Sequence, residues 1–279
     1  MRRDNGFVPA VELVVTDLDG TFWYREGDIH EQPHPTSLDA WRALEDRGIP
    51  VLVATGRRLG STRDPLARLG LAPPVVVLNG ALVVDLLAGG RRLHRHEYPD
   101  GHAVDVLAAF RAVGVEPCVY VDHAEIDVFH SDRPSTHPEH IASFGVHGAE
   151  HDLDAVVADH PVFMFGVMGH DREPFDELVR RLGDEFEVHI APDQWGGHSC
   201  TVGPLGLSKW DGVVAYCEHA GIDPARVLAI GDGPNDVDLL EGAAVAVVPA
   251  CGHEPALAVA DHVVRPTRAG GWADVVHLV

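Results

Sequence analysis

Apolar runs alternate with amphipathic segments in the first part of the chain. The runs are rich in valine and leucine without strict polar alternation, which is typical of strands buried on both faces of a sheet. Residues 34–48 carry apolar side chains at helical spacing and predict a helix, and 57–70 predict a weaker one. The last of the runs is predicted to bend into a hairpin at Asn79 and Gly80. The runs lie at 11–17, 50–56 and 74–85.

The same alternation returns in the last part of the chain. Helical patterns there alternate with short apolar runs, as they do in the first part. This order predicts an α/β fold with a doubly wound, mostly parallel, Rossmann-like sheet and helices on both faces. The helical patterns lie at 208–221, 235–243 and 253–260, and the apolar runs at 226–233, 244–250 and 262–266.

The middle of the chain follows a different pattern. From about residue 86 to 198, short strand patterns come in neighbouring pairs with two helical patterns among them. We therefore predict a core domain formed by residues 1–85 and 199–279, with an α+β domain at 86–198 inserted into it. Residues 131–152 show no period and are predicted to be a loop. The Gly-rich stretch 195–199 is either a substrate-facing loop or a hairpin turn.

Length and charge narrow the class of protein. The 279 residues fit about two domains, and the formal net charge of −22 makes the surface repel polyanions. We therefore expect no nucleic-acid partner and no membrane partner.

The most apolar window, 74–90, is interrupted by Asp85 and is too short to span a bilayer. The four cysteines form no CxxC pair and no signal-like apolar run opens the chain, which predicts a cytoplasmic location. The oligomeric state is left open.

Two carboxylates follow the first apolar run, in VVTDLDGTFW. Asp17 and Asp19 are two residues apart at a strand end, so they face the same side, where ligands of doubly wound sheets bind. Gly20 allows a sharp turn with free backbone amides. An ordinary turn is one alternative. A fragment of an EF-hand is another, but the loop lacks that motif's third acidic position and closing glutamate.

A second acidic cluster follows another apolar run, in VLAIGDGPNDVDLL. Asp232 ends the strand, and Asn235 and Asp236 lie where a helix begins, so a simple helix cap is the alternative for Asp236. Carboxylates converging from two strand ends require a cation, and hard oxygen ligands suit Mg²⁺. The histidine pairs have no matching metal partners and are interpreted as surface residues: His94 with His96, and His137 with His140.

Two further residues fit the binding of a phosphoryl group. Thr55 ends a strand and is followed by Gly56 and a helix start, which suits a donor to phosphate oxygens, although threonine is common at strand ends. Lys209 begins a helix, where its charge opposes the helix dipole unless an anion lies nearby. Taken alone, Lys209 fits a solvated surface residue better. No GxxxxGK[ST] loop is present, which excludes a P-loop nucleotide site.

These elements, in this order, resemble the haloacid dehalogenase (HAD) superfamily of phosphotransferases. Asp17-Leu18-Asp19-Gly20-Thr21 matches the first motif, Thr55 the second, Lys209 the third and Gly231–Asp236 the fourth. The insert between the second and third motifs resembles the α/β cap of the Cof-like branch, as do ATGR at 54–57 and LNGA at 78–81. The chain departs from the family pattern at Phe22-Trp23 and in its tail, GGWADVV.

The resemblance implies a mechanism. Asp17 is expected to be the nucleophile that forms an aspartyl phosphate, and Asp19 the acid and base. Mg²⁺ is expected to be held by the Asp17 side chain, the Asp19 carbonyl and Asp232, with Asp236 as a further ligand. The phosphoryl group is expected to be bound by Thr55, Gly56 and Lys209, with Asn235 orienting the phosphate or its loop.

These expectations favour a Mg²⁺-dependent phosphatase of a small phosphorylated metabolite, such as a sugar phosphate. A phosphohexomutase with the same chemistry is an alternative and would need clustered arginines in the cap. A non-catalytic phosphometabolite sensor is the other alternative. Arg57 either reaches toward substrate or forms a salt bridge on the helix surface.

Overall fold

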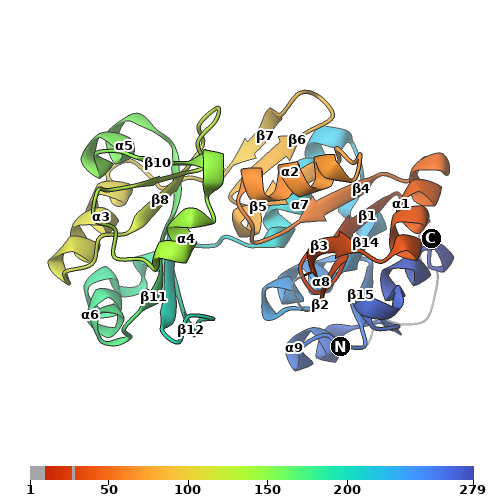
Figure 1. Cartoon of the computed structure of the whole chain (residues 1–279). Helices are drawn as coiled ribbons and strands as arrows, with labels where there is room; N and C mark the ends of the chain where they lie inside the picture. The colour runs from red at the N-terminus through yellow and green to blue at the C-terminus, as the bar shows by residue number, and fades with distance from the viewer. Residues whose placement is uncertain (1–9, 27–28) are drawn as a thin grey trace. The chain divides into compact units, whose positions relative to one another are not determined.

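A computed structural model describes residues 10–26 and 29–279, with the side chains of 25–31 left out of the description. The chain forms two compact units (Figure 1). The core unit takes the described residues up to Arg57, together with 63–95 and 208–279, and the cap unit takes 58–62 and 96–207. Each unit has its own sheet.

The core unit is built on an eight-stranded sheet in the order β16-β15-β14-β1-β4-β5-β6-β7. Neighbours from β16 to β5 are parallel, and β6 and β7 add antiparallel strands at one edge. This arrangement confirms the predicted mostly parallel, Rossmann-like sheet. The strands are β1 (Leu13–Thr16), β4 (Val51–Ala54), β5 (Pro74–Val77), β6 (Leu82–Asp85), β7 (Arg91–Arg95), β14 (Val227–Ile230), β15 (Val245–Pro249) and β16 (His262–Val264). A separate antiparallel pair joins β2 (Trp23–Glu26) and β3 (Ile29–Pro33).

Helices cover both faces of the core sheet. One face packs Leu13 and Val15 of β1 in a cluster with residues of three helices: α7 (Lys209–Ala220), α8 (Val237–Gly242) and α9 (Glu254–Val259). Since strand residues alternate, Thr16 points to the other face, where its Oγ1 accepts a hydrogen bond of 2.8 Å from Trp272 Nε1. Trp272 lies in the C-terminal 3₁₀ segment η7 (Gly271–His277), which contacts α1 (Pro35–Asp46). Helix α2 (Leu59–Arg68) is divided between the units, with residues 59–62 in the cap unit and 63–68 in the core unit.

The two departures from the HAD pattern pack against each other. Phe22, after the first motif, and Trp272, in the tail, have ring centroids 5.1 Å apart. Trp41 of α1 completes the group, with its ring 4.9 Å from Phe22 and stacked at 5.7 Å on Trp272. All three side chains are buried, so the bulky residues at 22 and 272 fill one continuous part of the core.

The cap unit has a six-stranded sheet in the order β10-β9-β8-β11-β13-β12. Its pairs are antiparallel except for β9 with β10. Phe165 of the long central strand β11 packs in one cluster with Phe110 of α3 and Phe175 of α6. The elements are β8 (Cys118–Val121), β9 (Val128–His130), β10 (Gly148–Glu150), β11 (Val162–His170), β12 (Phe186–Pro192), β13 (His198–Pro204), α3 (His102–Ala112), α4 (Pro138–Ala142), α5 (Leu153–Asp159) and α6 (Glu173–Leu182).

Several local expectations for the cap change. Residues 131–152, predicted to be a loop, contain the short helix α4 and the strand β10. Both are too short to give a periodic signal, and β10 depends on its pairing with β9. The stretch 195–199 spans the end of the β12–β13 hairpin turn, where Asp193 accepts backbone hydrogen bonds from Trp195 and Gly197. The strand β13 itself is not predicted by the sequence pattern.

The predicted domain limits, 85/86 and 198/199, stay a prediction. The compact units change over at 95/96 and 207/208, because β7 pairs with β6 of the core sheet and β13 pairs with β11 and β12 of the cap sheet. No helix within residues 10–26 and 29–279 is long and apolar enough to cross a membrane.

The interpretation of His140 as a surface residue is wrong. Its side chain is 6% exposed, and its Nδ1 lies 2.7 Å from Thr136 Oγ1. The other three histidines of the two pairs are half-buried. Burial, and then the charge of Arg58, lower the pKa of His140 to about 4.

The pKa of His140 predicts a pH-dependent loss of stability. Between the ordinary histidine value and about 4, the unfolded chain binds a proton at this position that the folded chain does not. The free energy of unfolding should therefore fall as the pH drops from about 6.5 to 4, by at most about 1.4 kcal/mol per pH unit. Urea unfolding of the His140→Asn variant should show a shallower fall, whereas substitution of the exposed His189 should not. Parallel curves for wild type and His140→Asn would contradict this assignment.

Candidate active site

The predicted site residues meet at the carboxyl ends of three neighbouring strands. Asp17 follows β1, Thr55 follows β4, and Asp232 lies just beyond β14. They line a cavity of about 370 Å³ in the core unit. Every predicted site residue lines this cavity except Lys209; the other lining residues are Arg57, Gly233, Pro234 and His253.

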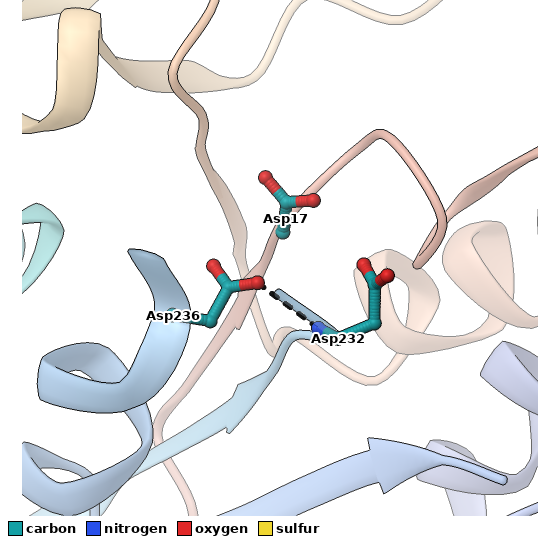
Figure 2. Close-up of side chains that lie close together, drawn as sticks. All are labelled: Asp17, Asp232 and Asp236. Carbon is teal, nitrogen blue, oxygen red and sulfur yellow. Dashed lines mark hydrogen bonds between the residues drawn. The ribbon is translucent and has the colours of Figure 1, made fainter. Parts of the chain in front are cut away.

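Three carboxylates are crowded together in this cavity. One oxygen from each of Asp17, Asp232 and Asp236 lies within 4.8 Å of the others, and Figure 2 shows the three side chains converging from two strand ends. Asp17 and Asp236 are buried. Like charges this close repel one another in a low dielectric, so the group suits a cation.

Lys209 supplies one positive charge to this cluster. Its Nζ donates to Asp17 Oδ1 and to Asp236 Oδ1, each at 2.7 Å, and its side chain is 1% exposed. The alternative of a solvated surface lysine is therefore wrong. Lys209 is the first residue of α7 and the only lysine in the sequence. Burial would lower its pKa, but the charges of Asp17 and Asp236 outweigh that effect and raise the pKa.

Burial raises the pKa values of two of the carboxyl groups, those of Asp17 and Asp232. Burial raises the pKa of Asp17 to about 8 despite the opposing charge of Lys209, and Asp236 adds to the rise. Burial likewise raises the pKa of Asp232. A divalent cation bound to these oxygens would favour the ionised carboxylates and reverse the trend.

Asp236 organises the loop that carries Asp232. Its Oδ2 accepts hydrogen bonds from the backbone nitrogens of Asp232 (3.0 Å) and Gly233 (2.8 Å), and Figure 2 draws the first of these. Its Oδ1 binds Lys209. Asp236 thus closes the turn that precedes α8 and makes no side-chain cap bond to that helix, and it also takes part in the charged cluster, so it is more than a simple helix cap.

Asp19 lies beside the cluster and is bound by an arginine. Arg57 Nε lies 2.5 Å from Asp19 Oδ2, and its Nη2 lies 2.7 Å from Oδ1, a two-point ion pair. The guanidinium carbon also lies 4.8 Å from the ring centroid of the buried Trp23. Of the two alternatives for Arg57, the structure shows a salt bridge, and its partner is the residue expected to act as acid and base.

The loop after β4 presents polar groups to the same cavity. Thr55 N donates to Val76 O (2.9 Å), and Thr55 Oγ1 accepts from Arg57 N at 3.2 Å. The hydroxyl of Thr55 still carries a proton that it can donate to a ligand in the cavity. Gly56, the next residue, lies at the cavity wall.

Sequence reasoning gives no role to two residues that support Asp232. Thr21 Oγ1 donates to Asp232 Oδ1 at 2.7 Å, and His253 N donates to Asp232 O at 2.8 Å. Thr21 lies within the first motif, so its presence there is a usable signal. His253 carries none, because only the folded sheet brings the start of α9 to the end of β14.

Comparisons with known proteins match nearly the whole chain to haloacid dehalogenase-like hydrolases and phosphatases. A family model described as haloacid dehalogenase-like hydrolase matches residues 14–276. The phosphoglycolate phosphatase of Methanopyrus kandleri is 26% identical over 94% of this chain and 94% of its own.

Two solved structures show the same fold. TM0651 of Thermotoga maritima aligns with a TM-score of 0.80 at 20% identity, over 96% of this chain and 97% of that one. The HAD subclass IIB sugar phosphatase BT4131 aligns with a TM-score of 0.73 at 19% identity, over 96% and 98%.

The burial of Lys209 predicts a large cost of removing its charge. Lys209→Met would leave Asp17 and Asp236 buried without their cation, and we expect the free energy of unfolding to fall by about 3–5 kcal/mol in the presence of a chelator. Arg133→Met removes the same charge from a side chain that is 91% exposed and serves as the control. Equal effects of the two substitutions in urea unfolding would contradict the role given to Lys209.

Proposed function

Because the chain belongs to the haloacid dehalogenase-like hydrolase family, we propose that it is a Mg²⁺-dependent phosphatase of a small phosphorylated metabolite, acting through an aspartyl-phosphate intermediate. One observation carries the proposal. Asp17, a buried carboxylate bound to Lys209, lies in a polar cavity beside a second carboxylate, Asp19, that can exchange protons with a substrate.

The charges around the cavity support a divalent cation. With all four carboxyl groups ionised, Asp17, Asp19, Asp232 and Asp236 would stand against two cations, Lys209 and Arg57, which would leave two excess negative charges. A dianionic phosphate would be repelled from such a site. Mg²⁺ held by Asp17, Asp232 and the Asp19 carbonyl, with Asp236 as a further ligand, would neutralise the excess and polarise the phosphoryl group.

The residues of the chain divide the reaction between them. A carboxylate oxygen of Asp17 attacks phosphorus, the bond from phosphorus to the substrate oxygen breaks, and Asp19 gives its proton to the departing alkoxide. Water then attacks phosphorus, Asp19 takes a proton from it, and the bond to Asp17 breaks to release phosphate. Thr55, Gly56 and Lys209 bind the phosphoryl oxygens throughout.

The ion pair of Asp19 bears on this sequence of steps. In this structure both side-chain oxygens of Asp19 lie within hydrogen-bond distance of Arg57 nitrogens. Protonation of the leaving group needs the carboxylic acid, so Asp19 must exchange its partner as substrate binds. The guanidinium of Arg57 then turns toward the anionic substrate.

The arginines of the cap unit favour a phosphatase over a mutase. A mutase would need cap arginines to hold a second phosphate, but each of the six in this unit is paired with a carboxylate: Arg58, Arg111, Arg133, Arg172, Arg180 and Arg181.

The relative from M. kandleri is named for a small phosphorylated acid, which extends the candidate substrates beyond sugar phosphates. All four cysteines are unpaired, which fits the proposed cytoplasmic location.

Phosphate release tests the proposal directly. The protein should release inorganic phosphate from p-nitrophenyl phosphate and from part of a panel of sugar phosphates and 2-phosphoglycolate, and only with Mg²⁺. Asp17→Asn should lower turnover by at least about 10⁴-fold, because it removes the nucleophile. Full Mg²⁺-dependent turnover by Asp17→Asn would contradict the assignment. Movement of phosphate within a sugar, without release, would favour the mutase.

A further inference from the structure

The turn between β5 and β6 has an unusual backbone. Leu78 and Asn79, in the 3₁₀ turn η1 (Leu78–Gly80), have φ angles of 51° and 54°. They are the only non-glycine residues with positive φ in the part of the chain that the structure describes. This left-handed region is unfavourable for a side chain such as leucine, so the contacts of the turn must hold it in place.

The main chain of this turn is bonded to the loop after β4. Leu78 N donates to Arg57 O at 2.9 Å, and Asn79 N donates to Thr55 O at 3.1 Å. The bonded loop carries Thr55 and Gly56, the proposed phosphate ligands. These two hydrogen bonds therefore hold the backbone of the Thr55–Gly56 loop in place.

The side chain of Asn79 reaches a second loop of the site. Asn79 Oδ1 accepts a hydrogen bond of 3.1 Å from Asn235 Nδ2. The same oxygen lies so close to Gly56 that a Cβ there would be 3.0 Å away. Gly56 and Asn235 both line the cavity. Asn79 thus joins the loop after β4 to the loop after β14.

The helix that carries Lys209 rests on the same turn. Gly212, one turn into α7, packs so closely that a Cβ would lie 2.4 Å from Val76 Cγ1 and 3.2 Å from Gly80 Cα. Other residues of α7 and η1 also lie close together. The turn therefore touches all three elements that carry the proposed phosphate ligands.

We propose that Asn79 is a positioning residue of the phosphate site. Its left-handed backbone and its amide together set the spacing between the Thr55–Gly56 loop and Asn235. Asparagine suits both tasks, because it tolerates this backbone region and its amide offers both an acceptor and a donor. This inference rests on the proposed phosphatase function and adds to it a residue that touches no reacting atom.

Two substitutions separate the backbone from the side chain. Asn79→Gly accepts the left-handed backbone without strain and removes only the amide, whereas Asn79→Ala removes the amide and adds strain. The probes are p-nitrophenyl phosphate for kcat and KM, and inorganic phosphate for its inhibition constant, at a temperature well below unfolding. We expect both variants to lower kcat/KM and weaken phosphate inhibition by about fivefold, the effect of one lost hydrogen bond. Asn79→Ala should lower the melting temperature more than Asn79→Gly does, because only the alanine is strained in the left-handed region.

A double-mutant cycle with Asn235→Ala tests the link between the loops. If Asn79 acts through Asn235, the double variant Asn79→Gly/Asn235→Ala should lose no more phosphate affinity than the single variant with the larger loss. Wild-type kinetics in Asn79→Gly, or losses that multiply in the double variant, would overturn the inference. A wild-type protein that neither hydrolyses p-nitrophenyl phosphate nor binds inorganic phosphate in calorimetry with Mg²⁺ would overturn the proposed function as well.

Discussion

Lys209 binds two buried carboxylates that are far apart in the sequence, Asp17 and Asp236. Its Nζ lies 2.7 Å from Oδ1 of each. Buried charges of this kind are tolerated only when every partner is present in good geometry. The end of β1, the start of α7 and the loop after β14 must therefore come together for any of these charges to be buried. The sheet order supplies this condition, because β1 lies next to β14 and α7 packs on the sheet.

The same electrostatics explain why the cavity is suited to chemistry. Burial raises the pKa of Asp17 to about 8, so a buried nucleophile in this place depends on nearby positive charge to remain ionised. Lys209 provides part of that charge, and the proposed Mg²⁺ would provide the rest. Asp19 is placed differently, because its side chain is 48% exposed and bound by Arg57. This difference fits the proposed mechanism, in which Asp17 attacks phosphorus and Asp19 exchanges protons with the substrate or water.

The sequence predicts the core well because its signals are local. Each parallel strand of the core sheet lies in an apolar run, and the polar residues that follow it mark the edge of the sheet where a site can form. The edge strand β7, Arg-Arg-Leu-His-Arg, has no such pattern and is not predicted. For that reason the sequence alone predicts that Asp17, Thr55 and Asp232 lie together, and they do line one cavity. The position of Lys209 at a helix start suggests a nearby anion, but the sequence pattern alone favours a solvated lysine and does not predict its burial.

The remaining features depend on tertiary contacts that no local pattern reveals. Helix α4 has five residues, and β13, His-Ser-Cys-Thr-Val-Gly-Pro, is ordered by pairing with strands on both sides. His140 resembles a surface histidine until Thr136 and the cap core enclose it. For Asn79 the sequence predicts only a hairpin bend, because its bond to Asn235 joins residues that are 156 positions apart.

Trapping of the phosphorylated enzyme tests the central claim, that Asp17 is a nucleophile served by Asp19. In the Asp19→Asn variant, hydrolysis of the intermediate should be slower than its formation from p-nitrophenyl phosphate, since a good leaving group needs no acid. Mass spectrometry of the acid-quenched variant should then find the peptide that contains Asp17 heavier by one phosphoryl group, and Asp17→Asn/Asp19→Asn should show no such gain. Turnover by the wild type with no phosphoryl group on Asp17 in the quenched variant, or with the group on another residue, would contradict the account.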